Sequence, residues 1–193
     1  MASAEEALRR EVDAMSPGLR EHVERTLAEA LRLAARHGVE ASKVRLAVLG
    51  HDLLRLTPPD ELLRMASEAG IEPNAAERAA PVLLHGALAA RLLADRFGVD
   101  DAAVLAAVRY HTTGRAEMST LEKVVFLADK TEPGDLAQHP EWREVHDLAQ
   151  DDLDAAMLGA LALYLERARR EGWTVHPDVV AAREWLIADK REV

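Results

Sequence analysis

The sequence of 193 residues contains no cysteine, so it can form neither a disulfide bond nor a metal site with thiolate ligands. Histidine and carboxylate side chains would have to bind any metal ion, which favours iron, manganese, zinc or similar cations. No apolar stretch approaches the length of about 20 residues that a membrane-spanning helix needs. The N-terminal segment is acidic and unlike a signal peptide, so we expect a cytoplasmic protein that contacts no membrane.

Positive charge is also in short supply. The chain has 24 lysines and arginines against 34 aspartates and glutamates, which gives a formal net charge of −10. A surface this acidic is poorly suited to nucleic acid, so we expect no nucleic-acid partner. A phosphate-bearing substrate would need local positive charge, which metal ions or a few well-placed arginines would supply.

Aromatic residues make up only 4% of the chain, while the strong helix formers alanine, leucine and arginine are abundant. The length fits one domain with one core. The apolar periodicity predicts eight or nine helices and no strand, so we expect an all-α, single-domain helical bundle spanning residues 1–193. The charged residues 1 to about 15 are expected to form a frayed leading segment.

Capping residues, glycines and prolines predict where these helices begin and end. Ser119, with Glu122 three residues later, is typical of a capping box. Residues 132–135 are predicted to be a loop. The expected helices are residues 17–37, 42–55, 61–69, 81–97, 101–111, 120–130, 140–149, 151–171 and a last one from 177 through 185.

The dipeptide His51-Asp52 lies in a segment, residues 44–54, that is apolar on nearly all sides and should be buried. Burying an imidazole and a carboxylate is costly unless both have partners. Alone, the pair would be explained by an ordinary histidine–aspartate hydrogen bond in a core. A metal ion is the alternative partner, and other residues of the chain favour it.

Four more potential ligands lie toward the inward faces of four other predicted helices: His22, His85, His111 and Asp129. Polar residues at core positions usually have a function, and helical bundles commonly build metal sites from side chains on several helices. A carboxylate such as Asp52 can bridge two cations. Two cations about 3.5–4 Å apart would clamp the attacking and leaving oxygens of a phosphoryl displacement.

The order His, His-Asp, His, His, Asp on helices resembles the HD-domain phosphohydrolase superfamily. Further motifs are similar to its YqeK-type branch, the symmetrical bis(5'-nucleosyl)-tetraphosphatases, and the resemblance extends from about His22 to Trp185. These motifs are Arg-Tyr-His-Thr-Thr-Gly-Arg at residues 109–115, Leu-Glu-Lys-Val-Val-Phe-Leu-Ala-Asp at residues 121–129 and Glu-Pro-Gly at residues 132–134.

The resemblance implies an HD-type helical fold and hydrolysis of diadenosine tetraphosphate to two ADP by a metal-bound hydroxide. It implies two metal ions, with iron preferred and manganese or another divalent cation as alternatives. One ion would take His22, His51, Asp52 and Asp129, and the other would take Asp52, His85 and His111, with Asp52 as the catalytic bridge. Arg55, Thr113 and Arg115 are the expected phosphate contacts.

Several alternatives stay open at this point. The metal ligands would be the same in an HD-type nucleotidase or nucleoside-triphosphate hydrolase, and a non-catalytic nucleotide-binding protein is a further rival. The alternative interpretation of Arg55 is a solvated arginine at the end of a helix, with no role in substrate binding. The apolar helix from Leu153 to Leu165 fits either the core or a homodimer face. Lys130 and Asp135 depart from the family pattern, which has an aromatic and a basic residue there.

Overall fold

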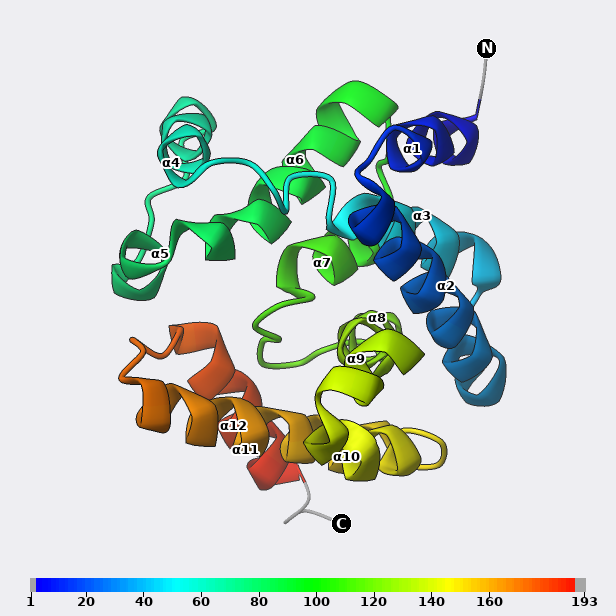
Figure 1. The fold of residues 1–193 in the computed structure, drawn as a ribbon, viewed down its shortest axis with the longest axis vertical. Coiled ribbons are helices and arrows are strands. Elements are labelled where there is room, and N and C mark those ends of the chain that lie inside the picture. The colour runs from blue at the N-terminus through cyan, green and yellow to red at the C-terminus, as the bar shows by residue number, and fades with distance from the viewer. Residues whose placement is uncertain (1–2, 190–193) are drawn as a thin grey trace.

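The computed structural model describes residues 3–189, and within that range it consists of helices joined by turns, with no strand (Figure 1). This confirms the predicted all-α class. The elements are α1 Ala4–Asp13, α2 Pro17–His37, α3 Ala41–His51, α4 Pro59–Glu68, α5 Ala75–Ala79, η1 Pro81–Leu84, α6 His85–Phe97, α7 Ala102–Tyr110, α8 Thr120–Thr131, α9 Pro133–Gln138, η2 Pro140–Trp142, α10 Arg143–Leu148, α11 Leu153–Glu171 and α12 Pro177–Asp189, where η marks 3-10 helices.

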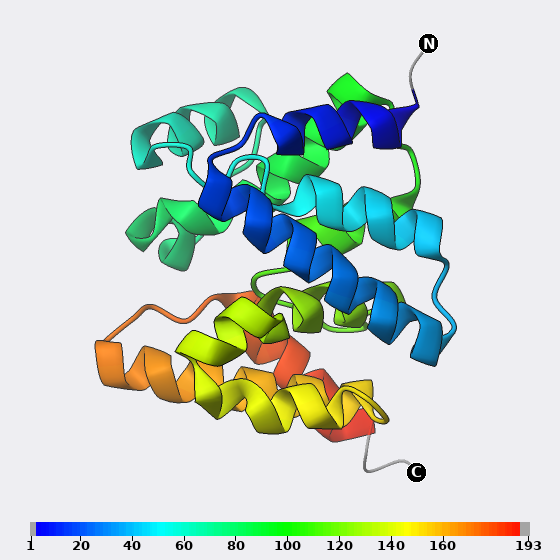
Figure 2. The same ribbon diagram turned by 45° about the vertical axis from the view of Figure 1, so that its right-hand side comes forward.

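Four helices form the centre of the molecule. α2 packs against α3 and α8, and α7 packs against α3, α6 and α8. α10 and α11 cover α8 from one side, and α4 and α5 lie on the other side of the molecule with η1 (Figures 1 and 2). The main core runs through the central helices, and Leu62, Ala66, Leu84 and Leu88 form a small separate core under α4. No helix of the described residues is long and apolar enough to cross a bilayer.

Several predicted helix boundaries are confirmed. α2 starts with Pro17 in its first turn and ends at Gly38, whose φ of 68° is left-handed and therefore suits glycine. α8 begins with the predicted capping box, in which the Ser119 hydroxyl accepts from the Glu122 N–H and the Glu122 carboxylate accepts from the Ser119 N–H.

From Ser3 onward, where the structure describes it, the leading segment is not frayed, which corrects the sequence-based expectation. Residues 4–13 form α1, capped by a reciprocal pair of hydrogen bonds between Ser3 and Glu6. Leu8 and Val12, one turn apart, are both fully buried, and α1 packs on α3. The charged residues that suggested fraying occupy the outer face of an amphipathic helix, and only two apolar side chains are needed to anchor the inner face.

Two predicted boundaries near the motifs are also wrong. α3 stops at His51 instead of continuing to Arg55, and residues 52–56 form successive turns. Residues 132–135 are not a loop. Glu132 is the N-cap of the short helix α9, its carboxylate accepts from the Gly134 N–H, and Pro133 occupies the first helical position. The helix α5 was not expected either, although Asn74 and Glu77 cap it reciprocally.

Candidate metal centre and its cleft

The structure brings the six predicted ligands together from five helices. His22 comes from α2, His85 from the start of α6 and Asp129 from α8. His51 is the last residue of α3, Asp52 caps that helix, and His111 caps α7. Helix ends therefore deliver most of the site. His51, Asp52, His85 and His111 are buried, as the apolar surroundings of the His-Asp pair predicted.

Asp52 lies at the middle of this group, and its two oxygens face different histidines. Oδ1 lies 3.1 Å from His85 Nε2 and 3.6 Å from His111 Nε2. Oδ2 lies 3.6 Å from His51 Nε2 and 3.8 Å from His22 Nε2. The carboxylate thus separates two pairs of imidazole nitrogens, which is the arrangement expected of a bridging ligand.

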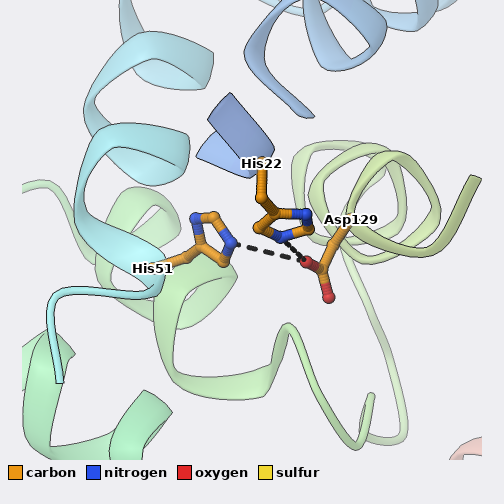
Figure 3. A group of neighbouring side chains, drawn as sticks. All are labelled: His22, His51 and Asp129. Carbon is orange, nitrogen blue, oxygen red and sulfur yellow. Dashed lines mark hydrogen bonds and ion pairs between the residues drawn. The ribbon is translucent and has the colours of Figure 1, made fainter. Parts of the chain in front are cut away.

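Asp129 completes one side of the group (Figure 3). Its Oδ1 lies 3.0 Å from His22 Nε2 and 3.4 Å from His51 Nε2. These three side chains offer one ligand atom each within a single small volume, and so do His51, Asp52 and His111. The group therefore contains two overlapping three-residue sets of the kind that hold a metal ion.

Backbone carbonyls fix the orientation of three of the histidines. His51 Nδ1–H donates to the Val48 carbonyl at 2.7 Å, and His111 Nδ1–H donates to the Val108 carbonyl at 2.7 Å. His85 makes the same hydrogen bond to Val82. Because a carbonyl only accepts, each Nδ1 carries a hydrogen, and Nε2 is the ring nitrogen that faces Asp52. In metal sites generally, a hydrogen bond from the ring nitrogen that does not bind the metal orients the histidine.

This arrangement fits a cation and is costly without one. The buried Nε2 of His51 has no hydrogen-bond partner. The Nε2 atoms of His85 and His111 lie only 3.0 Å apart, although both Nδ1 atoms carry the hydrogen. Two ring nitrogens at that distance can share at most one hydrogen, and buried polar atoms without partners are rare. A divalent cation bound by these nitrogens would remove both problems.

The electrostatics agree with metal binding. Burial works against ionisation of Asp52, but the charges and hydrogen bonds of the neighbouring histidines outweigh it and hold the pKa of Asp52 well below its ordinary value. Burial also works against ionisation of Asp129, but the charge of Lys130, followed by His22 and His51, holds its pKa well below the ordinary value. Burial alone would lower the pKa of His22, but Asp129 and Asp52 raise it to about 9. A cation that binds to His22 near neutral pH therefore displaces a proton.

Glu132 is a further member of the site that the sequence did not single out as a functional residue. Its side chain is completely buried, and Oε1 lies 3.4 Å from His22 Nδ1. Arg25 donates two hydrogen bonds to the same carboxylate, at 2.6 and 3.1 Å. A Cβ atom on Gly134 would lie 2.7 Å from the Arg25 guanidinium. The Glu-Pro-Gly motif thus positions a carboxylate behind His22 and leaves room for its arginine partner.

Gly86 has a comparable role on the other side of the site. A Cβ atom there would lie 2.8 Å from the carbonyl oxygen of Arg109 and 3.3 Å from the His111 ring. Only glycine lets the start of α6 approach the end of α7 this closely. This close approach brings the ring nitrogens of His85 and His111 together.

The centre opens into a cleft of about 1200 Å³, which His22, Asp52, His85, His111 and Asp129 help to line. Five cationic side chains line it as well: Arg25, Arg55, Lys130, Arg167 and Arg170. They provide local positive charge within a chain of net charge −10.

The two departures from the family pattern, Lys130 and Asp135, also line this cleft. Lys130 donates to Asp129 Oδ2 at 2.8 Å and to the His111 carbonyl at 3.3 Å, and it lies over the ring of Phe126. It thus ties two ligand-bearing elements together. Burial and the nearby Glu132 raise the pKa of Asp135.

The three predicted phosphate contacts differ in position. Arg55 lines the cleft. Thr113 and Arg115 do not: the Thr113 hydroxyl donates to the Gly114 carbonyl, and the Arg115 guanidinium binds the buried Glu122 carboxylate at 2.6 and 2.9 Å. Arg115 also lies over the Tyr110 ring. These contacts give Thr113 and Arg115 a place in the architecture of the loop after α7, away from the cleft.

Residues 19–134 match the family model described as HD domain. The chain belongs to this family. The matched range contains all six clustered residues and Glu132. It ends inside α9, so the HD domain model covers neither α10 nor the two C-terminal helices.

Proteins of several bacteria are similar to this chain over most of its length. The chain is 30% identical over 86% of its length to "Bis(5'-nucleosyl)-tetraphosphatase, symmetrical" of Bacillus subtilis, covering 88% of that protein. It is 29% identical over 89% of its length to the protein of the same name in Halalkalibacterium halodurans, covering 90% of it. A crystal structure of a predicted HD superfamily hydrolase involved in NAD metabolism, from Clostridium acetobutylicum, has a TM-score of 0.90 and 28% identity, covering 98% of this chain and 99% of that one.

Proposed function

We propose that this HD-domain hydrolase cleaves diadenosine tetraphosphate symmetrically into two molecules of ADP. The observation that carries the proposal is the convergence of four imidazoles and two carboxylates at one wall of a cleft that five arginine and lysine side chains also line. The relatives named above as symmetrical bis(5'-nucleosyl)-tetraphosphatases support the choice of substrate.

The proposal includes two divalent cations, with iron as the preferred metal. His22, His51, Asp52 and Asp129 would hold one, Asp52, His85 and His111 would hold the other, and Asp52 would bridge them. The opposed directions of the two Asp52 oxygens support this division. When bound, such a pair of cations polarises phosphate oxygens and makes water a stronger nucleophile near neutral pH.

The protein's own residues position the polyphosphate. Arg55 and Lys130 face the cleft and carry charge opposite to that of the substrate. Glu132 orients His22 through Nδ1, and the backbone carbonyls of α3, η1 and α7 orient the other histidines. Because helices and buried hydrogen bonds fix these groups, little reorganisation is needed when the substrate binds.

Product analysis tests the proposal directly. We expect the iron-loaded protein to convert diadenosine tetraphosphate to ADP alone, measured by ion-exchange chromatography with elemental analysis of the same sample. AMP and ATP as products would contradict symmetric cleavage. Comparable turnover of nucleoside monophosphates or triphosphates in the same assay would instead assign the protein to another HD-type activity.

A further inference from the structure

We propose that the end of the cleft at the C-terminus of α11 binds one nucleobase of the dinucleoside substrate by stacking. Tyr164, Arg167 and Trp173, which line this end, are called the aromatic subsite below. The inference rests on the proposed function, because it assigns a place to one part of that substrate. The aromatic subsite lies outside the range that the HD domain model matches, residues 19–134.

The three side chains of the aromatic subsite lie close together, with the Tyr164 and Trp173 ring planes tilted by 56° to each other. The ring centroids of Tyr164 and Trp173 lie 6.3 Å apart, and the guanidinium carbon of Arg167 lies 5.2 Å from the Trp173 ring. The turn after α11 creates this arrangement. Gly172, with a φ of 69°, reverses the chain, and the Trp173 N–H donates to the Ala168 carbonyl at 2.9 Å. Trp173 is thereby held beside the last turns of α11.

Trp173 is unusually accessible for so large an apolar side chain. It is 44% exposed, and only three other large apolar residues in the described part of the chain are comparably exposed: Leu56, Leu148 and Val180. Leaving apolar area in water costs about 25 cal/mol per Å². Exposed aromatic residues that line a cleft are typical of ligand sites, and a flat ligand that covered the indole would remove this cost.

The charges at this end favour a base over a phosphate group. Arg167 and Arg170 line it, but so does Glu166, and Arg170 already pairs with Glu171 at 3.2 Å. This balance offers a polyanion little attraction. Carboxylates are, however, good acceptors for the amino group of a base, and a guanidinium plane and an indole both stack on a purine.

The size and continuity of the cleft agree with a two-nucleoside substrate. A single cleft of about 1200 Å³ is lined both by the metal ligands and by the aromatic subsite. Sites for drug-sized ligands typically occupy about 300–1,000 Å³. A cleft of this size has room beyond the metal centre, and the aromatic subsite offers a nonpolar surface for the nucleoside there.

Substitution of Trp173 tests the inference in the iron-loaded enzyme. Trp173→Ala should raise the KM for diadenosine tetraphosphate about tenfold, since base–aromatic stacking has effects of this order. Trp173→Phe should restore most of the affinity because it keeps an aromatic face. Val180→Ala removes an apolar side chain with 41% exposure that does not line the cleft, so it should leave the KM unchanged.

Tryptophan fluorescence provides a readout that does not depend on turnover. A non-hydrolysable analogue with a methylene group at the central bridge should quench the fluorescence of the loaded wild-type protein. Because Trp142 also lines the cleft, the comparison is made in a Trp142→Phe background. There the quenching should be greatly reduced by Trp173→Phe and retained in Trp185→Phe, because Trp185 packs against the core under Lys123 and does not line the cleft.

The outcomes separate this inference from the proposed function. Symmetric hydrolysis with an unchanged KM in Trp173→Ala, or quenching that persists in Trp173→Phe, would overturn the aromatic subsite and leave the activity intact. Failure to form ADP, together with quenching that depends on Trp173, would overturn the proposed function and support a base-stacking site.

Discussion

The two ends of the cleft are built in different ways. At the metal centre the ligands lie at the ends of buried helices, and hydrogen bonds to backbone carbonyls or to Glu132 fix the imidazole rings. At the aromatic subsite, Trp173 is 44% exposed and lies against Tyr164 and Arg167 of α11. The difference shows where rigidity matters: phosphoryl transfer depends on fixed geometry, whereas stacking tolerates small shifts of a flat ligand. Substitutions should therefore reduce activity much more at the metal centre than at the aromatic subsite.

The largest effect is expected from Asp52→Asn. Loss of the bridging charge should remove metal and lower kcat about a thousandfold, since metal-ion catalysis supplies several kcal/mol and each 1.36 kcal/mol is a factor of ten. Steady-state kinetics and elemental analysis measure both effects. Asp95→Asn, which changes an exposed carboxylate outside the cleft, is the matched control. Retention of metal and turnover by Asp52→Asn would exclude a bridging role.

A smaller effect is expected from Glu132→Gln. Removing the carboxylate that orients His22 should weaken metal binding about 10- to 100-fold. Loss of the hydrogen-bond partner of a metal-ligating histidine typically has an effect of this size. Titration with a competing chelator measures the affinity. Glu21→Gln is the matched control, because Glu21 is exposed and lies 3.9 Å from the same arginine, Arg25, without contacting His22. An unchanged metal affinity would limit Glu132 to capping α9.

Arg55→Ala should weaken substrate binding to an intermediate extent and leave metal binding unchanged. We expect the KM for diadenosine tetraphosphate to rise about tenfold, with little change in metal content. A charge-assisted hydrogen bond to phosphate contributes about 1.5–3 kcal/mol, and the exposure of Arg55 favours the lower end of that range, which corresponds to about a tenfold change in affinity. Arg64→Ala, in an exposed cluster on α4 that does not line the cleft, should leave the KM unchanged. Equal KM values for both variants would show Arg55 to be a solvated arginine.

The smallest effect on catalysis is expected from Arg115→Ala. The KM should change less than about twofold, while the free energy of unfolding should fall by about 1–3 kcal/mol because the buried Glu122 loses its bidentate partner. Urea denaturation and steady-state kinetics measure the two quantities. A large rise in KM with unchanged stability would show instead that Arg115 contacts the phosphates, as the family resemblance implies, and would require the loop after α7 to reach the cleft.

Much of the fold was predictable because its signals are local. Glycine after α2, α6 and α11 and the capping box of α8 act within a few residues of the chain. The convergence of six polar residues was also predictable, since each lies on the inward side of an apolar helix. The resemblance to HD-type enzymes added the expected division of these six residues between two metal ions.

The remaining features depend on contacts between distant segments. The burial of α1 follows from the surface that α3 offers to Leu8 and Val12, which no local pattern reveals. Glu132 acquires its role from Arg25 and His22, more than 100 residues away. Arg115 matched a family motif, but its partner Glu122 could be identified only once the loop after α7 was placed.

The hydrogen bonds of His51, His85 and His111 to carbonyls three residues earlier have a consequence for how the centre handles its metal. Each of these rings is aimed by its own stretch of four residues, so the ligands are preset as the helices form and the cation does not have to assemble them. Extraction of one divalent ion and replacement by another should therefore proceed on the folded protein, with the choice of cation depending on supply as well as on the site.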